Sequence, residues 1–168
     1  MELVTRTFMI GIGATIVMDL WGLMLARAFG LPSPNYAMVG RWFGHMPAGR
    51  FAHAGIAAAA AVRGESILGW TAHYAIGIAY GALLVAVAGE SWVREPTPLP
   101  ALAIGLVTVV APYFIMQPAL GMGFAASKAP KPNVARLRTL VTHLVFGAGL
   151  YATAWVLAQF LPLGPATS

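Results

Sequence analysis

Apolar residues in this chain occur in four long runs, separated by segments that carry most of the charged residues. The runs extend over about residues 7–29, 66–88, 99–124 and 137–161. Each run has at least the roughly 20 residues that an α-helix needs to cross a bilayer. The pattern predicts an all-α, polytopic membrane protein whose single transmembrane domain, residues 1–168, is a bundle of four transmembrane helices.

The segment between the first two runs contains a shorter periodic pattern. Ser33-Pro34 is typical of an N-cap followed by proline at the first helical position. Four apolar residues then recur at helical spacing: Tyr36, Val39, Phe43 and Met46. We therefore predict an interfacial amphipathic helix in this first loop. An irregular loop that touches the headgroups is the alternative.

Two prolines, Pro112 and Pro118, lie inside the third run. Each lacks the backbone N–H that would donate to the preceding helical turn. We therefore expect a kink or a loosened turn in this run.

Composition supports the membrane assignment and excludes several other classes. Hydrophobic residues make up 59% of the chain and charged residues only 9%, against about 25% charged residues in soluble domains. The net charge of +5 lies in the segments between the runs, so the expected partner is the lipid bilayer and not a nucleic acid. Cysteine is absent, and neither a nucleophile–base pair nor a metalloprotease motif is present, so an enzyme is not expected.

The distribution of basic residues predicts the orientation. Eight of the ten lie in the first loop and before the fourth run, on one side of the predicted bundle: Arg27, Arg41, Arg50, Arg63, Lys128, Lys131, Arg136 and Arg138. By the positive-inside rule this side faces the cytoplasm. We therefore expect a multi-pass protein of the bacterial inner membrane with both termini outside. Interfacial contacts with lipid headgroups are expected for Arg41, Lys128, Lys131, Arg136 and Arg138.

Polar side chains that are costly in hydrocarbon occur at four positions within the runs. An ionisable group there costs roughly 2.5–3.5 kcal/mol, so Asp19, His73, Gln117 and His143 are informative. With a rise of 1.5 Å per residue, all four lie roughly 8–12 Å from the basic end of their helices. We predict that they form one intramembrane polar site, shielded from lipid. A purely structural polar core is the alternative.

A weak internal repeat relates the two histidines. His73 is followed by Gly77 and His143 by Gly147, at the same depth in the second and fourth runs. Two parallel helical hairpins, each with a histidine on its second helix, would account for this. Glycines at spacings of four residues around His73 mark helix contacts, so His73 is expected to point into the bundle.

Three functions fit such a site. The first is a small-solute or ion permease, or its membrane component, in which Asp19 and a histidine exchange a proton. We expect it to work as a homo-oligomer, because four helices are few for a pathway. The second is a membrane redox protein with non-covalent haem between His73 and His143, or a metal ion held by these histidines and Asp19. The third is a structural or assembly subunit of a membrane complex.

Several stretches resemble the bacterial membrane family known as domain of unknown function 2938. They are Gly13-Ala-Thr-Ile-Val-Met-Asp19-Leu-Trp21, Asn35-Tyr-Ala-Met-Val-Gly-Arg-Trp-Phe-Gly-His45, Gly69-Trp-Thr-Ala-His73-Tyr74, Met116-Gln-Pro-Ala-Leu-Gly121, and Arg136-Leu-Arg-Thr-Leu-Val-Thr-His143-Leu-Val-Phe-Gly147. The resemblance spans nearly the whole chain and includes all four polar-site residues. It implies a bacterial inner-membrane protein and implies no activity.

Overall fold

The computed structural model describes residues 2–164, and within them it confirms the all-α fold. Four segments are long and apolar enough to cross a membrane. They are α1 (Glu2–Phe29), α3 (Glu65–Arg94), the segment Pro98–Ala119 and α6 (Pro132–Phe160). The third segment consists of α4 (Pro98–Thr108), a π-helical stretch at Pro112–Met116 and the short α5 (Gln117–Ala119).

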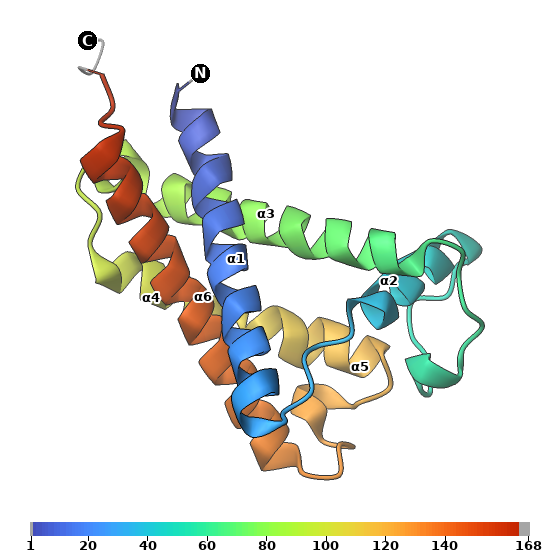
Figure 1. The fold of residues 1–168 in the computed structure, drawn as a ribbon. Coiled ribbons are helices and arrows are strands. Elements are labelled where there is room, and N and C mark those ends of the chain that lie inside the picture. Colours follow the sequence, from blue (N-terminus) through green and yellow to red (C-terminus); the bar gives the residue numbers. More distant parts are fainter. Residues whose placement is uncertain (1, 165–168) are drawn as a thin grey trace.

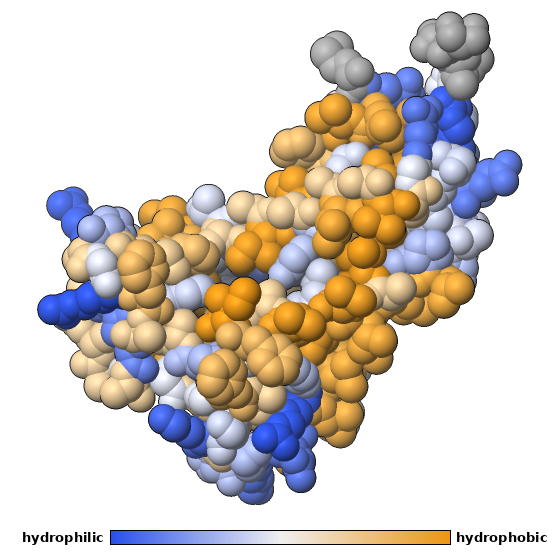
Figure 2. Space-filling model, turned by 180° about the vertical axis from the view of Figure 1, so that it is seen from behind, coloured by the Kyte–Doolittle hydropathy of each residue, from blue (hydrophilic) through white to orange (hydrophobic). Residues whose placement is uncertain are grey.

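Helices α1 and α6 run alongside each other, and α3 crosses α1 and leads away from them toward the first loop, while α4 crosses behind α6 (Figure 1). Both ends of the described chain lie at the same end of the molecule (Figure 1). We call this the terminal end, and the opposite end, with loops 30–64 and 120–131, the loop end. Figure 2 shows apolar residues over the middle of one face and hydrophilic residues toward the two ends.

Glycines set how closely the helices approach. Gly11 on α1 lies against the backbone of Gly77 and Ile78 on α3, where a methyl group would overlap backbone atoms. Gly105 on α4 and Gly147 on α6 make a similar approach. Small residues allow such contacts in membrane proteins, where helix association depends on packing. The main core is buried between these crossings and includes Ile10, Leu84, Phe146 and Leu150.

The predicted helix of the first loop is present as α2 (Tyr36–His45). Its N-cap is Asn35, whose side-chain oxygen accepts from the Ala37 N–H at 3.1 Å. The prediction that Ser33 caps this helix is wrong, because its hydroxyl instead donates to the carbonyl of Gly22 on α1. Both residue types cap helices, so the sequence pattern alone did not separate them.

Arg41, for which we expected contacts with headgroups, is bound within the protein, because α2 packs closely on α3. Gly40 and Gly69 bring the two backbones together, and Arg41 on the same side is only 9% exposed. Its guanidinium forms a two-point ion pair with Glu65, at 2.7 and 2.8 Å, and donates to three loop carbonyls, those of Ile56, Ala57 and Ala59. The bonds to Glu65 raise the pKa of Arg41 further.

The rest of the first loop is joined to the third segment. The N–H groups of His53 and Ile56 donate to the carbonyls of Ala119 and Leu120. Trp42 and Ile56 pack with the same two residues in a second, smaller core. The loop, α2 and α5 therefore form one packed unit at the loop end.

Helix boundaries differ from the expected ones in both directions. Helix α3 continues to Arg94 through a bend at Gly89, whose φ is 81°, and α6 begins at Pro132 instead of about residue 137. The third segment ends near Ala119, earlier than expected. The loosened turn expected in it is the π-helical stretch, which begins at Pro112.

Candidate functional site

Asp19 lies on α1 and receives hydrogen bonds from three side chains on two other helices. Its Oδ1 accepts from Nε2 of His73 at 2.9 Å and from the Tyr36 hydroxyl at 3.3 Å. Its Oδ2 accepts from the Tyr74 hydroxyl at 3.0 Å. The carboxylate therefore joins α1 to α2 and α3. The side chains of His73 and Asp19 are 9% and 21% exposed, respectively.

Aromatic rings surround this carboxylate. The Tyr36 ring stacks on the His73 imidazole with a centroid distance of 4.0 Å and lies 4.6 Å from Trp70. Burial, together with the negative charge of Asp19, raises the pKa of the Tyr36 phenol well above its usual value. Tyr36 therefore stays a neutral hydrogen-bond donor across the physiological range.

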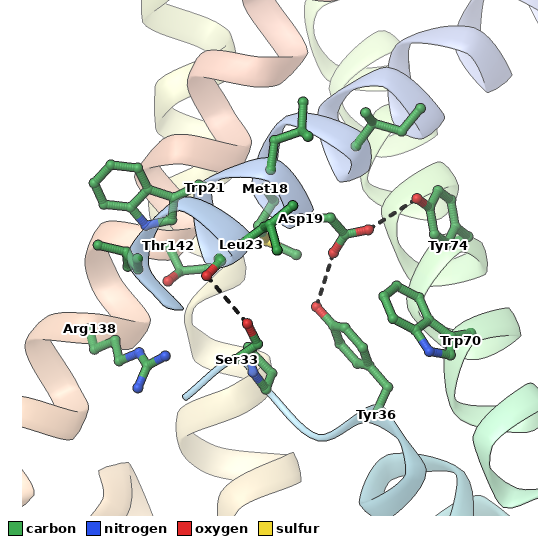
Figure 3. A pocket seen from close by; sticks show the side chains of 15 residues that line it. Met18, Asp19, Trp21, Leu23, Ser33, Tyr36, Trp70, Tyr74, Arg138 and Thr142 are labelled. Carbon is green, nitrogen blue, oxygen red and sulfur yellow. Dashed lines mark hydrogen bonds between the residues drawn. The ribbon is translucent and has the colours of Figure 1, made fainter. Parts of the chain in front are cut away.

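The Asp19 cluster forms part of the wall of an open cavity of about 460 Å³. Tyr36, Trp70 and Tyr74 line it beside the carboxylate, and Arg138 and Thr142 line it from α6. Figure 3 shows Asp19 pointing toward the two tyrosine hydroxyls, with Arg138 on the opposite side of the view. The size is within the range of about 300–1,000 Å³ found for small-molecule sites. We call this space the Asp19 cavity.

Arg138 and Ser33 hold the loop that borders the cavity. Nη2 of Arg138 donates to the carbonyl of Pro32, and Ser33 donates to Gly22 at 3.3 Å. Both contacts fix the extended segment between α1 and α2 against the bundle. Arg138 thus makes an internal contact at the place where we expected a contact with headgroups. Arg136 also bonds internally, to the Ala125 carbonyl and Asn133, whereas Lys128 and Lys131 are exposed.

Gln117 and His143 belong to a second polar group, between the third segment and α6. Thr108 donates its hydroxyl proton to the Gly105 carbonyl, so the 3.1 Å contact with His143 has Nδ1–H of the imidazole as donor. In the same way, Thr139 donates to the Ala135 carbonyl and accepts from Nε2 of Gln117 at 3.3 Å. Gln117 is 4% exposed, and its Oε1 has no hydrogen-bond partner among the described residues.

The structure therefore brings Asp19 and His73 into direct contact but leaves Gln117 and His143 with other partners. The packing of Gly13 on Thr153 and of Gly149 on Val17 gives the antiparallel register of α1 and α6. With a rise of 1.5 Å per residue, this register puts Asp19 about 6 Å along the helix from the level of His143. Asp19 lies about 12 Å from the level of Thr139, the α6 residue to which Gln117 bonds. The expected single site is thus two polar groups in neighbouring layers.

These positions bear on the suggested cofactors. Among residues 2–164, no three His, Cys, Asp or Glu side chains gather as ligands for a metal ion. Asp19, His73 and His143, the predicted metal ligands, are accordingly not assembled. The two histidines expected to ligate haem contact different helices, His73 with α1 and His143 with α4.

The sequence interpretation missed the tyrosines and threonines that complete both groups. Tyr74 directly follows His73, and a buried tyrosine hydroxyl needs a partner, so its position was an available signal. Tyr36 was assigned to the apolar stripe of the loop helix. Thr108 and Thr139 carried no signal, because threonine commonly bonds to its own helix backbone.

Comparison with known protein families identifies the family of this chain. A family model described as a protein of unknown function (DUF2938) matches residues 8–157, which include both polar groups and the Asp19 cavity. Neither a search of curated proteins nor a search of solved structures found a match. Because the model covers most of the sequence, the chain belongs to the DUF2938 family of proteins of unknown function.

Proposed function

We propose that this protein is a permease for small solutes or ions, or the membrane component of one, with the Asp19 cavity as its binding site. The observation that supports this is the position of an ionisable pair, Asp19 and His73, at a cavity large enough for a small solute. Such groups are costly within membrane helices and usually serve solute or proton pathways.

The surroundings of Asp19 favour a solute with a positively charged nitrogen. A carboxylate has about four acceptor positions, and three are used by His73, Tyr36 and Tyr74. The remaining one, on Oδ2, is available to an ammonium group. Trp70 and the two tyrosines line the same wall, and aromatic faces attract cations within about 6 Å. Arg138, on the same cavity, suits the carboxylate of a zwitterion.

The Asp19–His73 contact suggests how solute movement is linked to protons. Histidine changes its charge near neutral pH, and here its Nε2 lies 2.9 Å from the carboxylate of Asp19. A cation that binds Asp19 repels the proton of the pair and favours its release to water. Return of the proton displaces the cation, so the two exchange at one site.

The bundle and the basic loops suggest the setting of this activity. We place the protein in the bacterial inner membrane with both termini outside, because eight of ten basic residues lie in or near the loop end. A homo-oligomer is part of the proposal, since four helices are few to enclose a path.

The experiment uses purified full-length protein in liposomes that contain pyranine, a pH-sensitive dye. Outside gradients of choline, betaine and glycerol offer a cation, a zwitterion and a neutral solute. We expect choline added outside to alkalinise the lumen in a protein-dependent way, because each cation that enters is exchanged for a proton that leaves, and glycerol to have no effect. Asp19→Asn should abolish the response, whereas Glu95→Gln, at an exposed acid outside the cavity, should retain it.

Two results would contradict the proposal. The first is an equal response with Asp19→Asn, reconstituted with unchanged helical circular dichroism. The second is a Soret band in the purified protein that is lost in His73→Ala and His143→Ala, which would establish a haem protein. Absence of flux together with co-purification of a partner would favour the assembly subunit.

A further inference from the structure

A second charged site lies at the terminal end, far along α1 from Asp19. Arg6 is on the second turn of α1 and is only 5% exposed. Its Nη1 is buried and has no hydrogen-bond partner among residues 2–164. A buried guanidinium without a compensating acceptor is strongly unfavourable, so this nitrogen is the feature that needs an explanation.

Within residues 2–164, no acid forms an ion pair with Arg6. Glu90 pairs with Arg94 through its Oε1, at 2.6 and 3.0 Å. Glu2, one turn before Arg6, forms no ion pair within the described part of the chain and lies close to Gly164. No carboxylate of the described residues therefore balances the positive charge of Arg6.

Arg6 lines a small cavity of about 100 Å³ together with Arg94. Val93, Ala158, Pro162 and Leu163 form the remaining wall. The second guanidinium, Arg94, is oriented by Glu90 and by the carbonyl of Gly164, to which its Nη1 donates at 2.9 Å. The cavity thus combines two guanidinium groups with an apolar wall, a combination that suits a compact anion. We call it the Arg6 cavity.

We propose that the Arg6 cavity binds a phosphate group. Guanidinium groups bind tetrahedral oxyanions through paired N–H donors and are better suited to this than ammonium groups. The cavity also lies where α1 begins and α3 ends, the level at which spanning helices meet lipid headgroups. The phosphate of an anionic lipid fits both the charge and the apolar wall, and free phosphate offers the same chemistry.

The test measures ligand binding by the full-length protein in detergent. Thermal unfolding is followed while either inorganic phosphate or phosphatidylglycerol in mixed micelles is added, and retained lipid is detected by native mass spectrometry. We expect a saturable rise in melting temperature and, for the lipid, one retained molecule per chain. Arg6→Gln should lose both effects. Arg27→Gln, at an exposed position on the same helix, should keep them.

The two ligands identify the source of the phosphate. A shift with phosphatidylglycerol alone assigns the site to a lipid headgroup, and an equal shift with inorganic phosphate assigns it to the free anion. Arg6→Lys retains the charge and should fold even where Arg6→Gln does not, but it should bind more weakly because the paired donors are lost. Binding by Arg6→Gln or Arg6→Lys equal to that of the unchanged protein would overturn the proposal, as would no shift with either ligand.

Discussion

Hydroxyl groups determine how the buried polar residues of this protein are satisfied. Tyr36 and Tyr74 donate to Asp19, while Thr108 and Thr139 accept from His143 and Gln117. In both groups, a side chain that would be costly alone in hydrocarbon is paired with a hydroxyl on a neighbouring helix. Single residues therefore link helix packing to the chemistry of the cavity.

Loss of the Tyr74 hydroxyl should destabilise the protein, because it is the only described side chain that donates to Oδ2 of Asp19. A hydrogen bond to a charged group contributes about 1.5–3 kcal/mol, so Tyr74→Phe should lower the free energy of unfolding by roughly this amount or somewhat less. Unfolding in detergent with increasing denaturant measures it. Tyr80→Phe, on the same helix, is the matched control, since no described side chain or backbone group bonds to its hydroxyl. Equal losses in both variants would contradict the assignment.

The sequence identified the rare residues of the site but not their common partners. Asp19 and His73 were predictable as a pair because ionisable groups are scarce in these apolar runs and lie at similar depth. The separate position of His143 was not predictable, since the depth of a residue does not specify which helices are adjacent. The partner of His143 depends on the close approach of α4 and α6 at Gly105 and Gly147, which only the structure gives.

Among the helices, the two hairpins α1–α3 and α4–α6 share a contact pattern. In each, a glycine four residues after the histidine, Gly77 or Gly147, packs on the preceding long helix. In each, the histidine bonds to that same helix, through Asp19 or Thr108. The geometry around the histidines thus agrees with the weak sequence repeat, although their partners differ in charge.

The contact of α2 with α3 should be intolerant of any side chain at Gly40. A methyl group there would overlap the carbonyl of Glu65, and overpacking typically costs about 1–3 kcal/mol. Gly40→Ala should therefore lower the melting temperature and increase protease cleavage in loop 46–64. Gly55→Ala is a suitable control, because open space surrounds that position. Equal protease resistance of the two variants would show that α2 does not depend on this contact.

Helix type was predictable from the apolar runs, but helix ends were not. The runs reflect the hydrocarbon-spanning part, whereas α3 and α6 continue beyond it with polar residues such as Arg94 and Asn133. The position of α2 was likewise predictable from its periodicity, but its burial was not. Periodicity identifies an apolar face and does not say whether lipid or another helix covers it.

At the scale of the whole molecule, the protein has two packed parts, each with its own core. The main core holds α1, α3, α4 and α6 together, and the smaller core joins the loops at the loop end. The Asp19 cavity lies between these parts and the Arg6 cavity at the opposite end. If the loop end faces the cytoplasm as proposed, the two cavities serve opposite sides of the membrane.

Single cysteines should report this orientation, because the natural chain contains none. Ser127→Cys at the loop end and Glu95→Cys near the terminal end are both exposed. In intact cells, a membrane-impermeant maleimide should label Glu95→Cys, and Ser127→Cys only after permeabilisation. The reverse pattern would place the termini inside and contradict the positive-inside interpretation.

The close contact between α2 and α3 limits how the walls of the Asp19 cavity can move. Because Gly40 and the Arg41–Glu65 ion pair fix these helices to each other, Tyr36 travels with α3 as one rigid body. Along the chain, residues 30–35 connect this body to α1, and they start at Gly30, whose φ is 65°. If Asp19 and Tyr36 separate, the backbone of this short segment has to change its conformation. The hydrogen bond from Arg138 to the Pro32 carbonyl restrains that change.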